Sequence, residues 1–470
     1  MANVHADENH KFSKYIYKNQ GYLFIEDIQL KTLQTELEAK IQALPSPVFV
    51  YSKAQLCDNV NEYKNAADEL ESKSMLGYAI KANPNYKILT LLKEMGCTGI
   101  CVSGNELKLA IKVGFEPTKL VLNGNGKNLW EIELAVKVGA LINIDSEDDY
   151  TRISQISGVL KLKSRVLLRV NPDIDPQVHP YIATGTKESK FGIDESSVQC
   201  IMTKIQQDVF VEVVGFHIHL GSTIDNVTIF RDVAEYLLKM CKNYKEQGFK
   251  NLQYINIGGG LGIDYTKHAQ QTKPNNNINV EEKQEMPSPS DLIKSIKDIL
   301  DSSKYTLILE PGRSMVGNTG LLLTKVIGVK KSNTCRKKFI VVDGSMTEVM
   351  RPCLYSAYHH IELTEPPHSE SPHCEPPNGD TLGEHTEDVY YVVGPVCESA
   401  DFLGKDRRLA TPAKGSGLVV FDVGAYCSSM GSNYNMRCRP AEVLIDGAAW
   451  SIIRSPETFD DLLRPYLDVK

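Results

Sequence analysis

The chain has 470 residues, of which 42% are hydrophobic and 24% charged, with a net charge of −7. This composition is typical of a globular protein and argues against a disordered chain, a collagen-like repeat or a coiled-coil rod. No basic block suggests nucleic-acid binding, and no apolar run approaches the roughly 18 residues of a membrane-spanning helix.

Eight short β-branched runs follow one another along the first two thirds of the chain, and helical patterns separate most of them. In Ile229–Cys241, for example, the apolar residues gather on one helical face. Alternating strands and helices predict parallel βα units, and eight consecutive units favour a closed (β/α)8 barrel over an open doubly wound sheet. The runs are Met75–Ala82, Thr98–Ser103, Leu120–Asn123, Ala140–Asp145, Arg165–Val170, Val213–Leu220, Tyr254–Ile257 and Thr306–Leu309.

After Gly312 the pattern changes to strands with few long helices between them. It predicts a C-terminal β domain, a β-sandwich or β-barrel, that also takes in the N-terminal segment, with Val48–Tyr51 pairing in it. We expect three regions: 1–47 packing with the β domain, 48–315 as the barrel, and 316–470 as the β domain. The later strand-like runs are Leu321–Val329, Lys338–Asp343, Val389–Val393, Gly417–Asp422 and Glu442–Ile445.

Two segments, 270–290 and 365–388, have the polar and proline-rich composition of inserted loops. We interpret His368, His373 and Cys374 in the second as loop composition and expect no metal site there. The cysteines show no metal-ligand or disulfide spacing, and the first ten residues contain no apolar targeting segment. A cytoplasmic protein with reduced thiols is the expectation.

Polar residues and glycines stand at the ends of all eight predicted barrel strands. In a barrel of this kind the carboxyl ends of the strands carry the chemistry, so we expect these residues to form one site. In chain order they are Lys81; Ser103 and Glu106; Asn123 and Asn125; Asp145; Arg169 and Asn171; His219; Gly258, Gly259 and Gly260; and Glu310, Pro311, Gly312 and Arg313.

Lys81 alternates in phase with Ala79, which predicts a side chain that points into the barrel mouth. It is either a lysine that reaches solvent or a desolvated amine suited to Schiff-base chemistry, and its position leaves both open. The glycines Gly258–Gly260 permit close backbone approach and anion binding, and Arg313 follows the next strand. Because phosphate sites in these barrels use the loops after strands seven and eight, a lysine with this cradle suggests pyridoxal phosphate.

Two other motif interpretations are weaker. The run Gly258–Gly262 is not a dinucleotide fingerprint, because Ile263 stands where that motif needs glycine. His217 and His219 share a strand face and form a possible HxH metal pair, but no other histidine ends a barrel strand to complete it.

Six ordered motifs resemble the diaminopimelate decarboxylase family, a branch of the alanine-racemase-like barrel enzymes that use pyridoxal 5'-phosphate. The resemblance implies decarboxylation of meso-2,6-diaminopimelate at its D-centre to L-lysine, the final step of lysine biosynthesis. It also implies a homodimer with shared active sites. The motifs are Tyr78–Asn83, His217–Ser222, Gly258–Gly262, Glu310–Arg313, Gly394–Ser399 and Gly424–Tyr426.

The resemblance also implies roles for individual residues. Lys81 would form the covalent link to the cofactor, Glu310 would face its ring nitrogen, and Cys397 would return a proton to the α-carbon. The implied cofactor-binding residues are Lys81, His219, Ser222, Gly258, Gly259, Gly260, Glu310, Pro311, Gly312, Arg313 and Tyr426, with His219 stacking on the ring. The implied substrate-binding residues are Arg313, Arg351, Tyr355, Glu398 and Tyr426. The implied catalytic residues are Lys81, Cys397 and His219.

The run Ile100-Cys101-Val102 departs from many bacterial relatives, which have an aspartate in this strand, and it is similar to the plant-type branch. The nearest alternative is a related ornithine, lysine or arginine decarboxylase. The substrates of these enzymes have no distal carboxylate for Arg351 to bind. A racemase would place arginine at the ring nitrogen where this chain has Glu310. A catalytically dead regulator with this fold is disfavoured because Lys81 and Cys397 are both present.

Overall fold

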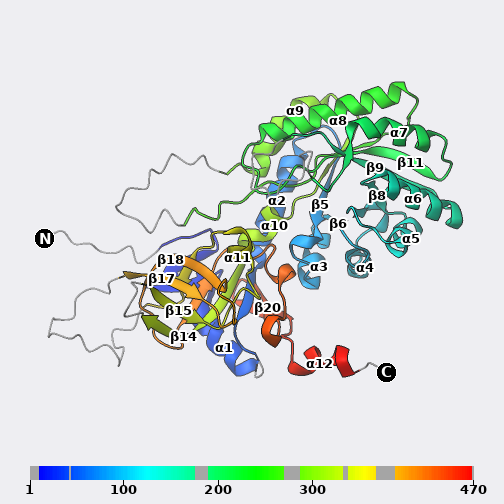
Figure 1. Cartoon of the computed structure of the whole chain (residues 1–470). Coiled ribbons are helices and arrows are strands. Elements are labelled where there is room, and N and C mark those ends of the chain that lie inside the picture. Colours follow the sequence, from blue (N-terminus) through cyan, green and yellow to red (C-terminus); the bar gives the residue numbers. More distant parts are fainter. Residues whose placement is uncertain are drawn as a thin grey trace, which may run out of the picture. The chain divides into compact units, whose positions relative to one another are not determined.

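The described residues build a parallel sheet, a mixed sheet and a small antiparallel sheet near the N-terminus (Figure 1). A computed structural model describes residues 10–41, 44–174, 189–268, 286–331, 337–366 and 387–467. Contacts divide the chain into a barrel unit, Cys57–Ile263 with Lys283–Met315, and a β unit, which comprises Met1–Leu56, Asp264–Glu282 and Val316–Lys470. The boundaries expected from the sequence, 1–47, 48–315 and 316–470, stay predictions.

Among the described residues of the barrel unit, eight parallel strands form a closed barrel, because the last strand pairs with the first. The predicted (β/α)8 barrel is confirmed, and each of the eight runs overlaps one strand. The strands are β5 (Ser74–Ala79), β6 (Thr98–Cys101), β7 (Val121–Leu122), β8 (Leu141–Ile144), β9 (Ser164–Asn171), β11 (Val211–His217), β12 (Tyr254–Asn256) and β13 (Thr306–Leu309), with the short β10 (Ile193–Asp194) beside β9.

Amphipathic helices follow the strands. Asn85, Ser103, Ser146 and Ser288 cap four of them by accepting backbone N–H bonds. Helix α8 buries the apolar face predicted for Ile229–Cys241, and the aliphatic cluster that includes Leu167 and Val214 fills the barrel. The helices are α2 (Lys53–Asp68), α3 (Tyr86–Glu94), α4 (Gly104–Val113), α5 (Leu129–Val138), α6 (Glu147–Leu160), α7 (Glu195–Gln206), α8 (Thr228–Glu246) and α9 (Pro289–Asp301).

The β unit is built on a mixed sheet with the strand order β18-β17-β15-β14-β4-β20-β21; β19 also pairs with β14, and β16 pairs with β19. Strand β4 pairs antiparallel with β14 and parallel with β20. The bounds are β4 (Val48–Ser52), β14 (Gly320–Lys331), β15 (Lys338–Val342), β16 (Ile361–Leu363), β17 (Glu387–Val393), β18 (Phe402–Ala410), β19 (Gly417–Val420), β20 (Ala441–Asp446) and β21 (Ala449–Arg454).

The N-terminal segment belongs to the core of the β unit, as predicted. It contains β1 (Ile16–Asn19), β2 (Tyr22–Ile25), β3 (Ile28–Gln29) and α1 (Leu30–Lys40). Leu23, Leu33 and Leu37 are fully buried in one cluster with Leu321 and Val443 of the sheet. This apolar burial attaches the segment to the β unit.

The predicted inserted loops 270–290 and 365–388 lie largely outside the described residues, as do His368, His373 and Cys374. In the part of the chain that is described, no helix combines the length and apolar character that crossing a membrane requires.

A buried ion-pair chain ties the N-terminal strand to β16. Glu362 accepts from Lys18 Nζ at 2.5 Å and contacts His360 Nε2 at 3.1 Å. Burial raises the pKa of Glu362, but His360 and Lys18 outweigh it and lower that pKa to about 2. The carboxylate therefore stabilises the β unit when it is ionised.

Replacing Glu362 by glutamine should make the β unit less sensitive to acid. Because the folded pKa of about 2 lies below the usual 4.5, the stabilisation is fully present above pH 4.5 and is lost as the pH falls towards 2. Glu362→Gln should cost about 3 kcal/mol near neutral pH and flatten the loss of melting temperature in this acidic range, followed by calorimetry. Glu133→Gln, which removes a surface ion pair with Lys137, is the control. Parallel acid curves for wild type and Glu362→Gln would contradict the assignment.

Candidate active site

A buried carboxylate lies at the carboxyl end of the barrel. Glu310 directly follows β13 and is 7% exposed. Asn123 Nδ2 donates to both of its oxygens at 3.0 Å, and Asn256 Nδ2 donates to Oε1 at 2.7 Å. Burial raises the pKa of Glu310 above its usual value, and the two amides and the charges of Arg169 and Lys81 offset only part of this rise. The strand ends thus hold one acidic group at the centre of the barrel.

Lys81 does not lie in a strand. Strand β5 ends at Ala79, and Lys81 occupies the 3-10 turn Ile80–Ala82 with an exposed side chain. The strand alternation used to predict its direction therefore ends before Lys81, and the direction stays a prediction. The turn is fixed by Tyr78, whose hydroxyl donates to the carbonyl of Asn83 at 3.0 Å. The Lys81 charge still acts on the barrel mouth: burial lowers the pKa of His219 well below its usual value, and Lys81 lowers it further.

The three glycines after β12 form a backbone cradle that side chains would block. A Cβ on Gly259 would lie 2.1 Å from the carbonyl oxygen of Glu310, and one on Gly260 would lie 2.4 Å from that of Gly221. Gly260 also has a φ of +116°. The Gly259 N–H donates to Nδ1 of His219 at 3.2 Å, which positions that ring beside the cradle.

Arg313 and Ser222 stand together in the barrel unit. Arg313 begins the short helix α10 (Arg313–Val316), is 7% exposed, and donates from Nε and Nη2 to Ser222 Oγ at 3.2 and 3.1 Å. The Pro311 carbonyl accepts from the N–H of Ala79 at 2.9 Å, which joins the segment Glu310–Arg313 to the end of β5. The predicted barrel residues are therefore gathered at one end of the barrel.

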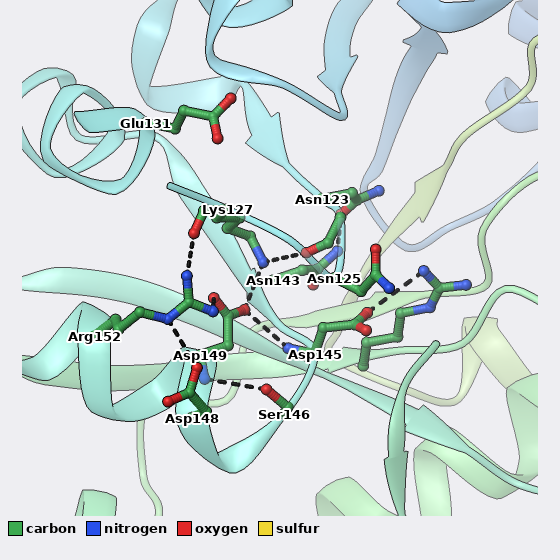
Figure 2. A network of polar contacts seen from close by, with 12 residues as sticks. Asn123, Asn125, Lys127, Glu131, Asn143, Asp145, Ser146, Asp148, Asp149 and Arg152 are labelled. Atoms are coloured by element: carbon green, nitrogen blue, oxygen red, sulfur yellow. Dashed lines mark hydrogen bonds and ion pairs between the residues drawn. The ribbon is translucent and has the colours of Figure 1, made fainter. Parts of the chain in front are cut away.

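A buried ion pair supports the loop after β7 (Figure 2). Lys127 Nζ lies 2.6 Å from Asp149 Oδ2 and 2.6 Å from the carbonyl oxygen of Gly124. Asp149 Oδ2 also accepts the N–H of Asp145 at 3.1 Å. The loop that begins at Asn123 is thereby held against the end of β8, and with it the amide that binds Glu310.

Asn143, Asn256, Lys127 and Asp149 were missed as site residues in the sequence. The available signal was a polar residue inside an apolar strand, as in Leu141-Ile142-Asn143-Ile144 and Tyr254-Ile255-Asn256. Such a residue must find hydrogen-bond partners in the barrel, because an unpaired buried amide is costly.

In the β unit, Arg351 is oriented by two aromatic rings. It is 5% exposed and begins helix α11 (Arg351–Tyr355). Its Nη1 contacts His359 Nε2 at 2.8 Å, and its guanidinium lies 4.4 Å from the ring centre of Tyr265. Since His359 Nδ1 donates to the carbonyl of Phe421 at 2.8 Å, Nε2 accepts from Arg351.

Cys397 and Glu398 lie on an exposed loop with a fixed backbone. Asp401 accepts the N–H groups of Val396 and Met346, both at 2.7 Å, and Asn435 Oδ1 accepts that of Cys397 at 2.8 Å. Tyr355 and Tyr426 are partly buried elsewhere in the β unit. Whether these β-unit residues meet those of the barrel unit stays a prediction.

The barrel residues fit pyridoxal phosphate on structural grounds. The three glycines let the backbone after β12 pass close to the carbonyls of Glu310 and Gly221, and Arg313, bound to Ser222 beside Gly221, brings a buried positive charge suited to phosphate. Glu310 offers a buried acceptor for a protonated ring nitrogen, and Lys81 offers a primary amine.

Comparisons with known proteins agree with this chemistry. Residues 56–317 match the family model described as "Pyridoxal-dependent decarboxylase, pyridoxal binding domain". The barrel and its site therefore define a pyridoxal-phosphate-dependent decarboxylase.

Individual relatives narrow this class. A probable chloroplastic diaminopimelate decarboxylase of Oryza sativa is 46% identical over 94% of this chain and 83% of its own. The Aquifex aeolicus diaminopimelate decarboxylase is 37% identical over 98% and 99%. The structure of the Helicobacter pylori diaminopimelate decarboxylase complexed with L-lysine has a TM-score of 0.79 at 32% identity, over 92% of this chain and 99% of its own. The chain belongs to the diaminopimelate decarboxylase family, and its similarity to the rice protein accords with the plant-type branch.

A methyl group at Gly259 should damage the cradle specifically. Gly259→Ala forces its Cβ against the Glu310 carbonyl, so we expect about 3 kcal/mol of lost stability, the upper end of overpacking costs. Cofactor binding should weaken in parallel. Gly126→Ala is the matched control, because nothing lies within 4 Å of that Cβ. Thermal unfolding measures the stability, and absorbance titration with pyridoxal phosphate measures cofactor binding. Equal stability and equal binding in the two variants would contradict the role assigned to Gly259.

Proposed function

We propose that the chain decarboxylates meso-2,6-diaminopimelate to L-lysine and carbon dioxide, the final step of lysine biosynthesis. The observation that carries the proposal is the barrel end itself, where the Lys81 turn, the Glu310 carboxylate and the glycine cradle stand together. Membership of the diaminopimelate decarboxylase family supports this substrate.

Each residue of the barrel site has a physical role in this proposal. Bound pyridoxal phosphate supplies a protonated aromatic ring that takes up the electron pair released when carbon dioxide leaves. Lys81 anchors the cofactor covalently, and Glu310 holds the proton on its ring nitrogen. Gly258–Gly260, Ser222 and Arg313 bind the phosphate, and His219 packs on the ring.

Residues of the β unit recognise and protonate the substrate. Arg351 presents a guanidinium that His359 and Tyr265 already hold in place, so little side-chain entropy is lost when it binds the distal carboxylate. Tyr355 and Tyr426 assist there, together with Arg313 of the barrel unit, and Glu398 binds the distal ammonium. Cys397 Sγ holds the proton that replaces carbon dioxide at the α-carbon.

A substrate panel tests the activity. Wild type should release carbon dioxide from meso-diaminopimelate and show little or no release from ornithine, lysine or arginine, which lack a distal carboxylate. Lys81→Ala should abolish release because it removes the anchoring amine. Borohydride reduction of wild type should place the pyridoxyl mass on the Lys81 peptide. Preference for another amino acid would overturn the substrate, and a label on another lysine would overturn the anchor.

We further propose a homodimer in which Cys397 and Glu398 of one protomer complete the site of its partner. Cys397 and Glu398 are exposed and belong to the β unit, whereas Lys81 belongs to the barrel unit. A two-fold axis would generate two identical shared sites.

Mixing two inactive variants tests the shared site. In a hybrid of Lys81→Ala and Cys397→Ala protomers, both lesions fall in one site and the other site stays intact. Random exchange should therefore restore about a quarter of the wild-type sites, measured by carbon dioxide release. Each variant alone should stay inactive. Demonstrated exchange, by tagged co-purification, without any activity would mean that each protomer completes its own site.

The cytoplasmic location stays a proposal. The rice relative is named chloroplastic, so fractionation of the source cells with an antibody against this protein is the deciding measurement.

A further inference from the structure

A closed circuit of buried polar side chains surrounds Glu310. Asn123 binds the carboxylate with Nδ2 and receives Asn143 Nδ2 at its own Oδ1; Figure 2 shows these two amides facing each other. Asn143 Nδ2 also contacts His217 Nδ1 at 2.9 Å. The fourth side, from His217 Nε2 back to Glu310 Oε2, measures 3.6 Å. All four side chains are less than 9% exposed.

The carboxylate sets the direction of every hydrogen bond in this circuit. An ionised carboxylate only accepts, so Asn123 must turn its amide nitrogen to Glu310 and its oxygen to Asn143. Asn143 must then present its nitrogen. A flipped Asn123 would place its oxygen 3.0 Å from both carboxylate oxygens, which repulsion forbids.

The same direction determines which nitrogen of His217 carries the proton. Asn143 donates to Nδ1, so Nδ1 accepts, and in a neutral imidazole the proton must sit on Nε2. Nε2 has no hydrogen-bond partner among the described residues, and Glu310 Oε2 lies just beyond hydrogen-bond range of it. Burial, and then the charge of Arg169, lower the pKa of His217 well below its usual value, which agrees with a neutral ring.

Other groups face Glu310 as well. Asn256 on β12 donates to it, and Arg169 on β9 and Lys81 in the turn after β5 act through their charges. Donors and cations surround the carboxylate, and His217 on β11 faces Oε2, the oxygen to which Asn256 does not donate.

We propose that His217 is a neutral positioning residue whose Nε2–H, 3.6 Å from Oε2, acts on Glu310 electrostatically beside the two amide donors and keeps that carboxylate ionised for the cofactor nitrogen. The last link, from Glu310 to the cofactor, rests on the proposed function. The proton position on His217 and its action on Glu310 do not, because they depend only on the circuit and on an ionised Glu310.

The first experiment reads the proton position directly. The full chain, labelled with 15N-histidine and freed of cofactor, is examined by NMR near neutral pH, and the His217 signals are those that disappear in His217→Gln or, equally, in His217→Asn. We expect an unprotonated Nδ1 and a protonated Nε2. A protonated Nδ1, in either a neutral or a charged ring, would overturn the proposal.

The second experiment distinguishes an N–H donor role of His217 from a role in packing alone. Glutamine can place its amide nitrogen near the position of Nε2, whereas asparagine reaches only the position of Nδ1. In cofactor-free chains labelled with 13C-glutamate, with Glu310 assigned through Glu310→Gln, His217→Asn should raise the pKa of Glu310 by about one unit, a tenfold change in its protonation equilibrium. His217→Gln should leave it within a few tenths of a unit.

Further variants keep this experiment decisive. If His217→Asn does not fold, His217→Phe, which keeps the ring volume and removes both nitrogens, replaces it with the same expected shift. Equal pKa values of Glu310 in wild type, His217→Gln and the donor-free variant would overturn the proposal, because a packing role does not distinguish them.

Turnover connects the circuit to the reaction. With meso-diaminopimelate, the donor-free variant should lower kcat about tenfold with little change in KM, and His217→Gln should restore most of kcat. If the NMR results are as expected but the wild type does not decarboxylate diaminopimelate, the proposed function is wrong and the proposed role of His217 is right. If the wild type decarboxylates diaminopimelate but the pKa of Glu310 is the same in every His217 variant, the proposed function is right and the proposed role of His217 is wrong.

Discussion

The arrangement of the barrel end follows from burying one carboxylate. An ionised carboxyl group inside a protein is costly unless donors and positive charges surround it. Glu310 obtains these partners from strands across the barrel: Asn123 after β7, Asn256 on β12 and Arg169 on β9. The barrel can supply them because its parallel strands all end at the same face, so residues far apart in the sequence point at one spot.

Backbone geometry and buried charge support that arrangement in different ways. Gly259 allows the backbone after β12 to approach the Glu310 carbonyl more closely than any Cβ permits. The Lys127–Asp149 ion pair, with both side chains at most 2% exposed, holds the loop that carries Asn123. Breaking a buried pair of this kind typically costs about 3–5 kcal/mol, so the loop keeps one conformation, and Asn123 keeps its position under the carboxylate.

The β unit prepares its residues by another route. Arg351 is fixed by His359 and Tyr265, and the Cys397 loop is fixed by Asp401 and Asn435, so both are held by hydrogen bonds within the β unit. The Arg351 side chain therefore needs little reordering to bind a substrate, which is the usual gain of preorganisation, and the backbone of the Cys397 loop is held in place. In the proposed enzyme the barrel would then supply the chemistry, and the β unit would supply substrate recognition and the returning proton.

The sequence alone predicted all eight barrel strands, the second β domain and the residues at the strand ends, because period and composition are local properties. It did not predict β18, whose run Phe402–Ala410 has four charged residues in a row and carries no β-branched residue, so only pairing with β17 makes it a strand. Nor did it place Lys81 correctly, since the end of β5 depends on pairing across the sheet. Above all, the surroundings of Glu310 were decided by tertiary structure. Only closure of the barrel brings Asn123 and Asn256 within hydrogen-bond distance of its carboxylate and links Asn123 through Asn143 to His217, and this arrangement determines which of their nitrogens can donate.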